Sequence, residues 1–571
     1  MVRIKTIPFN EQALTAAKGI TQAIQYPSVY ILSGKNEAYV GETINIAHRL
    51  QQHIRNADRR RLDQLRVIMD KQFNKSATTD IEASLIKYLS ADGQFRLQNG
   101  NAGIRDYNYY QKDRYKEKFE EIWRLLIKQG IAQHNQIQIE NSDLFKFSPY
   151  KSLTDDQYKT AESLFDSLLQ HLRKSEEAVF LVHGGAGTGK TVLAVYLMKL
   201  ISDIMAEHNE MEEEIEEAED EFSFQSLYYL KNVRSLKIGL VIPMTSLRKT
   251  LKKVFRQVQG LRSSMVIGPS DVIKSHYDVL IVDEAHRLRQ KKNIMPGHHK
   301  VFDRINASLG LTDGNELDWI QRCSDYQILF YDDTQSIKPT DIDQSVFQNL
   351  VQKQNTEEYF LTSQMRVAAG QDYIAYIENI LYEYGNPKKK EFKNYEFLLY
   401  DHIRDLTAVL KQKEKEVGLC RLVAGYAWKW KTQNHSLDQI RDQQLYDIEI
   451  EDERFIWNSV NEDWVNSANA INEVGCIHTV QGYDLNYAGV IIGPELGYDE
   501  QAQQIVVHAD QYFDRFGKAA IHDEEILKKY ILNIYKVLLT RAIRGTYVYV
   551  CDPALRNYFK TWIASAVAVR T

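Results

Sequence analysis

Gly184-Gly185-Ala186-Gly187-Thr188-Gly189-Lys190-Thr191 is the stretch that decides the fold of this chain. It matches G-x-x-x-x-G-K-[ST], the pattern of a phosphate-binding loop. An apolar run at 178–182 precedes it and another at 192–197 follows it, which predicts a strand, a glycine-rich turn and a helix in that order. The sequence therefore predicts an α/β domain that binds a nucleoside triphosphate.

Each residue type in this loop has a physical role. Gly184, Gly187 and Gly189 let the backbone curl so that its N–H groups point at phosphate oxygens, and the helix N-terminus adds positive potential. We expect Lys190 to reach the β- and γ-phosphates and Thr191 to hold Mg²⁺.

A further apolar run, at 279–282, leads into the paired carboxylates Asp283 and Glu284. Phosphoryl transfer needs a metal-bound phosphate and a positioned water. We expect Asp283 to join the magnesium shell and Glu284 to orient the attacking water.

Four further motifs follow along the chain, and a simple phosphate-loop kinase needs none of them. They are the strand-like run 327–331 with Asp332-Asp333-Thr334-Gln335, then Gln364-Met365-Arg366, 479–484 and 537–542. In order and content the series resembles superfamily-one helicases and translocases, especially bacterial relatives with a Schlafen-like helicase domain.

That resemblance implies two RecA-like lobes, each a doubly wound parallel sheet, with ATP in the cleft between them. It implies that Gln157 reads adenine and that Gln335 senses the γ-phosphate. Gln481 and Gly482 would link the second lobe to the cleft.

The resemblance also implies two arginine fingers, Arg366 and Arg541, reaching the nucleotide from opposite sides. Such fingers contribute ~10³–10⁵ in rate where they act. Arg544 competes with Arg541 for that role, and Tyr331 replaces a smaller residue usual before the Asp-x-x-Gln element.

The N-terminal hundred residues contain a separate cluster of polar and aromatic side chains. Two β-rich runs, 28–32 and 38–42, flank a turn, and the resulting hairpin would place Tyr30 and Tyr39 on neighbouring strands.

A helix-like segment follows this hairpin. On it, Arg49 and His53 are four residues apart and share a face, and a later helix carries Glu82. Two tyrosines, an arginine, a histidine and one carboxylate in this order resemble the GIY-YIG endonucleases.

The resemblance implies that Tyr30 helps to activate water, that Arg49 steadies the phosphate and that Glu82 holds Mg²⁺ or Mn²⁺. It gives Tyr39 and His53 positioning or proton-transfer roles. Either Asn99 or Asn101 fits the remaining position. The alternative is a small α/β domain with two cross-strand tyrosines that binds without cutting.

Composition divides the chain as follows. We expect a small α/β GIY-YIG domain at 1–105 and a polar connecting helix at 106–148. A first RecA-like lobe would span 149–356 and carry two insertions, an acidic one near 207–230 and another at 287–318. A second lobe would span 357–571.

Charge and hydropathy favour a cytoplasmic protein without a membrane partner. Apolar residues make up 44% of the chain, the net charge is −6, and no run approaches the ~20 apolar residues that a membrane helix needs. The cysteines match no zinc spacing. Nucleic acid would be held by local basic patches such as 49–75, with DNA favoured over RNA.

The sequence thus predicts an ATP-dependent helicase or translocase that carries its own metal-dependent endonuclease and cuts DNA in anti-phage defence or repair. Two alternatives stay open: a nucleic-acid-activated ATPase that does not cut, and an ATP-driven signalling switch.

Overall fold

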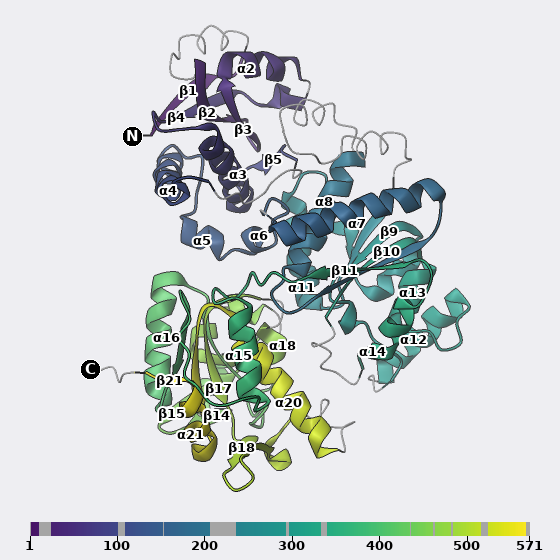
Figure 1. Ribbon diagram of the computed structural model, residues 1–571, viewed down its shortest axis with the longest axis vertical. Helices are drawn as coiled ribbons and strands as arrows, with labels where there is room; N and C mark the ends of the chain where they lie inside the picture. Colours follow the sequence, from purple (N-terminus) through teal and green to yellow (C-terminus); the bar gives the residue numbers. More distant parts are fainter. Residues whose placement is uncertain are drawn as a thin grey trace.

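The computed structural model describes residues 2–10, 24–56, 58–100, 109–151, 153–205, 236–292, 296–332, 340–433, 435–460, 463–480, 483–514 and 523–566. Within these ranges the chain forms three α/β bodies in succession, with the N-terminal domain at the top of Figure 1 and the two lobes below it. Gln335, Gln481, Gly482, Asn101 and the acidic insertion at 207–230 lie outside the described residues.

The N-terminal domain is built on a sheet in the order β1-β4-β2-β3-β5. Its strands are β1 (Arg3–Pro8), β2 (Ile24–Ser33), β3 (Glu37–Asn45), β4 (Gln64–Met69) and β5 (Arg96–Leu97). β2 and β3 form the predicted hairpin, with Tyr30 opposite Gly41 and Leu32 opposite Tyr39. The two tyrosines are therefore on neighbouring strands, as the sequence predicts.

Three helices complete this domain: α2 (Ile46–Arg55), α3 (Lys75–Asp92) and α4 (Lys112–Lys128). α4 is the expected connecting helix, but it is more than a spacer. Phe119, Trp123 and Leu126 of α4 are buried in the same hydrophobic core as Leu85 of α3. Their burial fixes α4 to the N-terminal domain.

The first lobe is a parallel sheet in the order β11-β6-β10-β9-β7-β8. Its strands are β6 (Ala178–Gly184), β7 (Ile238–Val241), β8 (Val266–Ile267), β9 (Tyr277–Val282), β10 (Ser324–Tyr331) and β11 (Thr356–Leu361). Its helices are α7 (Asp155–Lys174), α8 (Lys190–Met205), α11 (Thr245–Gln257), α12 (Pro296–Leu309), α13 (Glu316–Arg322) and α14 (Gln344–Val351).

Both faces of this sheet are covered. Phe180 and Val182 of β6 enter one hydrophobic core with residues of α7 and α8, while Val179 and Leu181 enter another with residues of α13 and α14. Successive side chains of a strand point to opposite faces, so this apolar run serves two helical layers. The doubly wound fold expected for the first lobe follows from this pattern.

The second lobe repeats the architecture with the order β14-β15-β16-β13-β17-β20-β12-β21, parallel except between β14 and β15. Its strands are β12 (Glu396–Leu399), β13 (Cys420–Ala424), β14 (Ile448–Ile450), β15 (Glu453–Trp457), β16 (Glu473–Gly475), β17 (Leu485–Ile492), β20 (Ala542–Val550) and β21 (Ala564–Ser565), with a separate hairpin of β18 (Leu496–Asp499) and β19 (Gln504–Val507). Its helices are α15 (Gln371–Leu381), α16 (Ile403–Val417), α17 (Leu437–Asp442), α18 (Ile477–Val480), α20 (Glu524–Leu539) and α21 (Pro553–Trp562).

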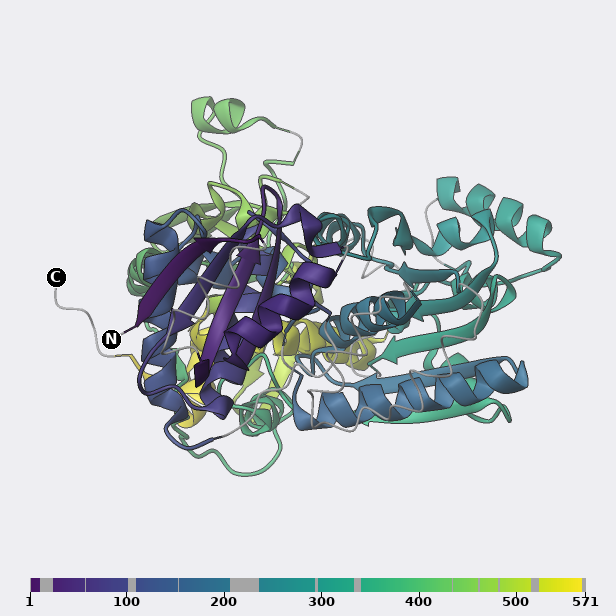
Figure 2. The same ribbon diagram turned by 90° about the horizontal axis from the view of Figure 1, so that it is seen from above.

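The lobe boundary expected between residues 356 and 357 falls inside β11. That strand pairs along its length with β6, so it belongs to the first sheet, and the first lobe extends to Leu361. The short helices α5 (Gln136–Glu140) and α6 (Asp143–Lys146) lie where the N-terminal domain meets the two lobes, and Figure 2 gives the view from above that domain. Within the described ranges, no helix combines the length and apolarity that crossing a membrane requires.

Candidate functional sites

The phosphate loop lies at the carboxyl end of β6, and α8 begins at Lys190, so the predicted strand, turn and helix are confirmed. The Thr191 hydroxyl donates to Oδ2 of Asp283 at 2.7 Å. Lys190 Nζ lies 3.2 Å from Oδ2 of Asp332, which follows β10. The carboxyl ends of three neighbouring strands thus converge on one point of the sheet edge.

Asp283 is fully buried, and its second oxygen, Oδ1, has no hydrogen-bond partner among the described residues. Burial, together with the neighbouring Glu284 carboxylate, raises the pKa of Asp283 to about 7. A buried, unsatisfied carboxylate oxygen beside a threonine hydroxyl fits the hard oxygen ligands that Mg²⁺ prefers.

Glu284 adopts the left-handed backbone region at φ 54°, which is uncommon for a residue with a side chain. Its Oε2 lies 3.0 Å from Nε2 of the buried His286. Burial acts to raise the pKa of Glu284, but the nearby His286 and Lys190 outweigh it and lower that pKa, so the carboxyl is ionised. Strained backbone of this kind clusters at functional sites.

Gln157 lies beneath the phosphate loop and is fully buried. Its Nε2 donates to the carbonyl of Thr188 at 2.8 Å, and its Oε1 accepts from the N–H of Thr154 at 3.2 Å. Gly189 has φ +81°, and a Cβ there would lie 2.2 Å from Gln157 Nε2. The amide therefore braces the loop in this structure, and adenine recognition by Gln157 stays a prediction.

Residues 364–366 cross from the end of β11 to the phosphate loop. The side-chain Nε2 of Gln364 donates to the carbonyl of Ala186 at 2.7 Å, and the backbone N–H of Met365 donates to the carbonyl of Gly187 at 2.9 Å. This places Arg366 at the mouth of the cleft, where its Nε donates to Oδ1 of Asp484 in the second lobe at 2.5 Å.

Arg541 reaches the same cleft from the end of α20 and is only 2% exposed. Burial and then the nearby Arg366 lower the pKa of Arg541 to about 9. Burial also acts to raise the pKa of Asp484, but Arg366 and then Lys146 lower it to about 2. Both arginines proposed as fingers therefore lie at one cleft between the lobes.

The cleft encloses about 770 Å³ including its open mouth. Three of its lining residues, Lys146, Phe147 and Lys151, lie between α5 and α7 and were missed by the sequence reasoning. They belong to no recognisable motif, and only their position just before Gln157 could have drawn attention to them. The roles proposed for Gln335, Gln481 and Gly482 fall outside the described residues.

The N-terminal cluster is also brought together in space. The hydroxyl of Tyr30 lies 2.7 Å from Nε2 of His53 and accepts from Nε of Arg49 at 3.2 Å. The rings of Tyr39 and His53 meet edge to face with centroids 5.0 Å apart. All four side chains are almost fully buried.

Gly41 makes this arrangement possible. It lies directly across the hairpin from Tyr30, and a Cβ at this position would lie 2.2 Å from the Tyr30 hydroxyl. Only glycine leaves room for the phenol to reach His53. The glycine of the Tyr39-Val40-Gly41 run thus has a steric function.

Electrostatics define the protonation states in this cluster. Burial lowers the pKa of His53 to about 2, helped by the charges of Arg59 and Arg49, so the imidazole is neutral. Burial raises the pKa of Tyr30; Arg49 opposes that effect and Glu82 adds to it. The Tyr30 hydroxyl therefore faces a neutral imidazole.

Glu82 lies on α3 and is partly exposed. Within the described part of the chain, no group of three or more histidine, cysteine, aspartate or glutamate side chains is placed to hold a metal ion. Asn99 has a structural role: its side chain accepts from the N–H of Val40 at 3.0 Å and donates to its carbonyl at 2.8 Å.

Comparison with known proteins matches extended parts of the chain to a family model and to a relative. A family model described as Schlafen group 3, DNA/RNA helicase domain, matches residues 177–552. An uncharacterized protein of Saccharomyces cerevisiae is 28% identical over 449 residues, which cover 71% of this chain and 90% of that protein.

Among solved structures, a chain from a study of DNA unwinding at forked double-stranded DNA by two coordinating Pif1 helicases is 12% identical. The match covers 67% of this chain and 91% of that chain, with a TM-score of 0.24. PCH-2 of C. elegans is 12% identical over 39% of this chain and 46% of its own, with a TM-score of 0.14. Structural similarity at this level carries no argument about the site.

Proposed function

Because the matched region spans most of the chain, the protein belongs to the Schlafen group 3 DNA/RNA helicase domain family, and we propose that it is an ATP-dependent nucleic-acid helicase or translocase carrying a metal-dependent endonuclease of the GIY-YIG type. The observation that carries the motor assignment is the convergence of Lys190, Thr191 and Asp283 at a cleft that is also lined by Arg366, from the segment after β11, and by Arg541, from the second lobe.

In the proposed ATPase, Lys190 and the loop N–H groups bind the β- and γ-phosphates, and Glu284 orients the attacking water. The ionised state of Glu284 suits this task because a carboxylate accepts a proton from water. Arg366 and Arg541 neutralise charge that develops on the transferred phosphoryl group.

Thr191 and Asp283 would hold Mg²⁺, as the unsatisfied Oδ1 of Asp283 suggests. When bound, the ion supplies charge neutralisation between the phosphates. Arg366 is paired with Asp484, so engaging the nucleotide requires the guanidinium to share or leave that partner. Exchange of partners by Arg366 would couple hydrolysis to lobe movement.

In the proposed nuclease, Tyr30 is the residue that takes a proton from water and passes its own to the neutral His53. The 2.7 Å contact between the Tyr30 hydroxyl and Nε2 of His53 supports this path. The lowered pKa of His53 makes the imidazole a weak base, so it would hold the proton only in passing. Arg49 both steadies the Tyr30 oxygen and presents a charge for phosphate.

Glu82 would hold Mg²⁺ or Mn²⁺ at this site. Because one carboxylate cannot fill the coordination sphere, the remaining ligands would be water and the phosphodiester itself. The ion would stabilise the leaving oxygen. Metal binding at this site should therefore be weak until substrate is present.

DNA is the proposed substrate, in genome defence or repair. The test is incubation of the purified protein with Mg²⁺ and plasmid DNA, single-stranded DNA or RNA, each with and without ATP. Cleavage together with stimulated ATP hydrolysis supports both activities. Stimulated hydrolysis without cleavage leaves an ATPase whose N-terminal domain binds, and hydrolysis indifferent to every nucleic acid favours a signalling switch.

A further inference from the structure

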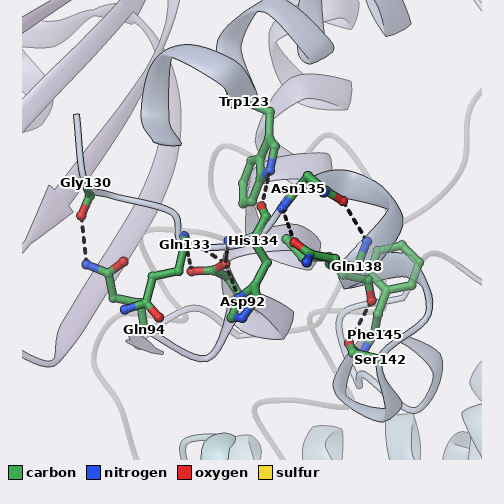
Figure 3. A network of polar contacts seen from close by, with 11 residues as sticks. Asp92, Gln94, Trp123, Gly130, Gln133, His134, Asn135, Gln138, Ser142 and Phe145 are labelled. Carbon is green, nitrogen blue, oxygen red and sulfur yellow. Dashed lines mark hydrogen bonds and ion pairs between the residues drawn. The ribbon is translucent and has the colours of Figure 1, made fainter. Parts of the chain in front are cut away.

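The connecting segment 129–151 is attached to α3 of the N-terminal domain by a network of hydrogen bonds (Figure 3). The Asp92 carboxylate, near the end of α3, accepts from the N–H of Gln133 at 3.0 Å and of His134 at 2.9 Å, and lies 3.0 Å from His134 Nδ1. The Asp92 side chain is buried, while that of His134 is half exposed.

Further contacts extend this attachment along the segment. The Tyr88 hydroxyl donates to Glu140 at 2.6 Å, and the Tyr150 hydroxyl donates to the carbonyl of Asn99 at 3.1 Å. Asn99 is the residue whose side chain holds Val40 beside the catalytic tyrosines. The segment is thus fixed to the domain that carries the proposed nuclease.

The same segment also contacts the second lobe. Asn141 Nδ2 donates to the carbonyl of Val417 at 2.7 Å, and Asn486 Nδ2 donates to Oδ1 of Asn141 at 2.9 Å. Lys146 Nζ donates to the carbonyl of Asp484 at 3.0 Å. Asp484 is the carboxylate that pairs with Arg366, so the segment ends at the nucleotide cleft.

The charges that line this cleft do not balance. Lys190 is paired with Asp332, and the four other cationic side chains of the lining, Lys146, Lys151, Arg366 and Arg541, face two carboxylates, Glu284 and Asp484. The excess of two positive charges among these side chains would be unfavourable in a site partly withdrawn from water. Burial lowers the pKa of both Lys146 and Lys151, while the nearby Asp484 acts to raise both.

Lys151 is the clearest case. It lines the cleft, and among the described residues its ammonium group has no hydrogen bond or ion pair. A flexible ammonium with three donors, held at the mouth of a phosphate loop, matches the oxygens of a polyphosphate. A bound anion would offset this excess of positive charge.

We propose that Lys146 and Lys151 bind the phosphates of the nucleoside triphosphate, so that the connecting segment is a third element of the nucleotide site and transmits its occupancy to the N-terminal domain. This inference rests on the nucleotide site assigned under the proposed function. Binding would draw the lysines toward phosphate, and the segment's contacts with α3 and with Asn99 would carry the shift to the tyrosine cluster.

The test is equilibrium binding of the non-hydrolysable ATP analogue AMP-PNP to the full chain, measured by calorimetry. Lys151→Ala should weaken binding by about tenfold or more, as expected for loss of a charge-assisted contact, and Lys146→Ala by a smaller factor. Lys151→Arg should retain most of the affinity. Lys128→Ala, on the exposed side of α4, is the matched control and should bind within twofold of the parent.

Amide hydrogen exchange of residues 129–151 gives a second readout. AMP-PNP should slow exchange there in the parent and in Lys128→Ala, and should not do so in the double variant of Lys146 and Lys151. If the parent binds and all variants bind within twofold with unchanged protection, the inference is overturned. If the parent binds no nucleotide, the proposed nucleotide site itself is wrong, and this inference falls with it.

Discussion

The Tyr30 hydroxyl lies 2.7 Å from Nε2 of His53, although the two residues belong to different elements, β2 and α2. Arg49 donates to the same hydroxyl, so the phenol oxygen contacts both a guanidinium and an imidazole. The three side chains form a hydrogen-bonded path inside a core that is nearly closed to solvent.

Replacing Tyr30 by phenylalanine removes one oxygen from this path and leaves the packing almost unchanged. We expect Tyr30→Phe to abolish metal-dependent cleavage of plasmid DNA while ATP hydrolysis stays at the parental rate. Glu82→Ala should give the same result because the metal loses its carboxylate. Cleavage by both variants at parental rates would reduce the domain to a binding module.

The protonation state of His53 predicts a pH profile. A pKa lowered to about 2 keeps the imidazole neutral from pH 5 to pH 8, so no proton needs to leave it over that range. The cleavage rate at saturating Mg²⁺ should therefore lack an inflection near the ordinary histidine pKa of ~6.5. A tenfold fall in rate between pH 7 and pH 5.5 with that midpoint would contradict the assignment.

Gly41 offers a steric test of the same cluster. In Gly41→Ala the new methyl would overlap the Tyr30 phenol, and such overpacking costs about 1–3 kcal/mol. We expect a lower free energy of unfolding in urea together with loss of cleavage. Gly297→Ala, where an added Cβ meets nothing within 4 Å, should leave both unchanged. Equal stabilities of the two variants would show that the overlap relaxes without cost.

Local signals predicted most of the fold. The phosphate loop, the hairpin carrying Tyr30 and the strand before Asp283 were identified because each has a strong apolar run and a distinctive turn. The lobe boundary was misplaced inside β11 because that strand's pairing with β6 is a long-range contact which no local pattern encodes.

The nucleotide cleft shows the same limit at the level of single residues. Lys146 and Lys151 look like ordinary solvated lysines in the sequence, and only the tertiary path of the connecting segment brings them to the cleft. The bracing of the loop by Gln157 was likewise invisible, because it depends on the position of Thr188 after folding.

Glu284→Gln tests the water-positioning role. The amide keeps the volume but cannot take a proton, so hydrolysis should fall by at least about a hundredfold, the usual worth of a general base. AMP-PNP affinity should stay within a few-fold, because Lys190 and Thr191 remain. Lys190→Ala should lose both hydrolysis and affinity. Hydrolysis by Glu284→Gln at the parental rate would show that another group positions the water.

The last prediction concerns Arg366 and its partner Asp484, which join the two lobes across the cleft. We expect hydrolysis to rise with single-stranded nucleic acid, because closure of the lobes completes the site. Arg366→Ala and Arg541→Ala should each lose most of the stimulated rate, since a finger contributes ~10³–10⁵, and should keep nucleotide affinity within a few-fold. Arg124→Ala, exposed on α4, controls for loss of a positive charge. Steady-state phosphate release measures these rates.

Asp484→Asn tests the ion pair itself. This substitution releases Arg366 from its partner, so the basal rate of ATP hydrolysis without nucleic acid should rise in that variant. The same phosphate-release assay measures it, and a basal rate unchanged in Asp484→Asn would mean that the ion pair does not restrain the finger.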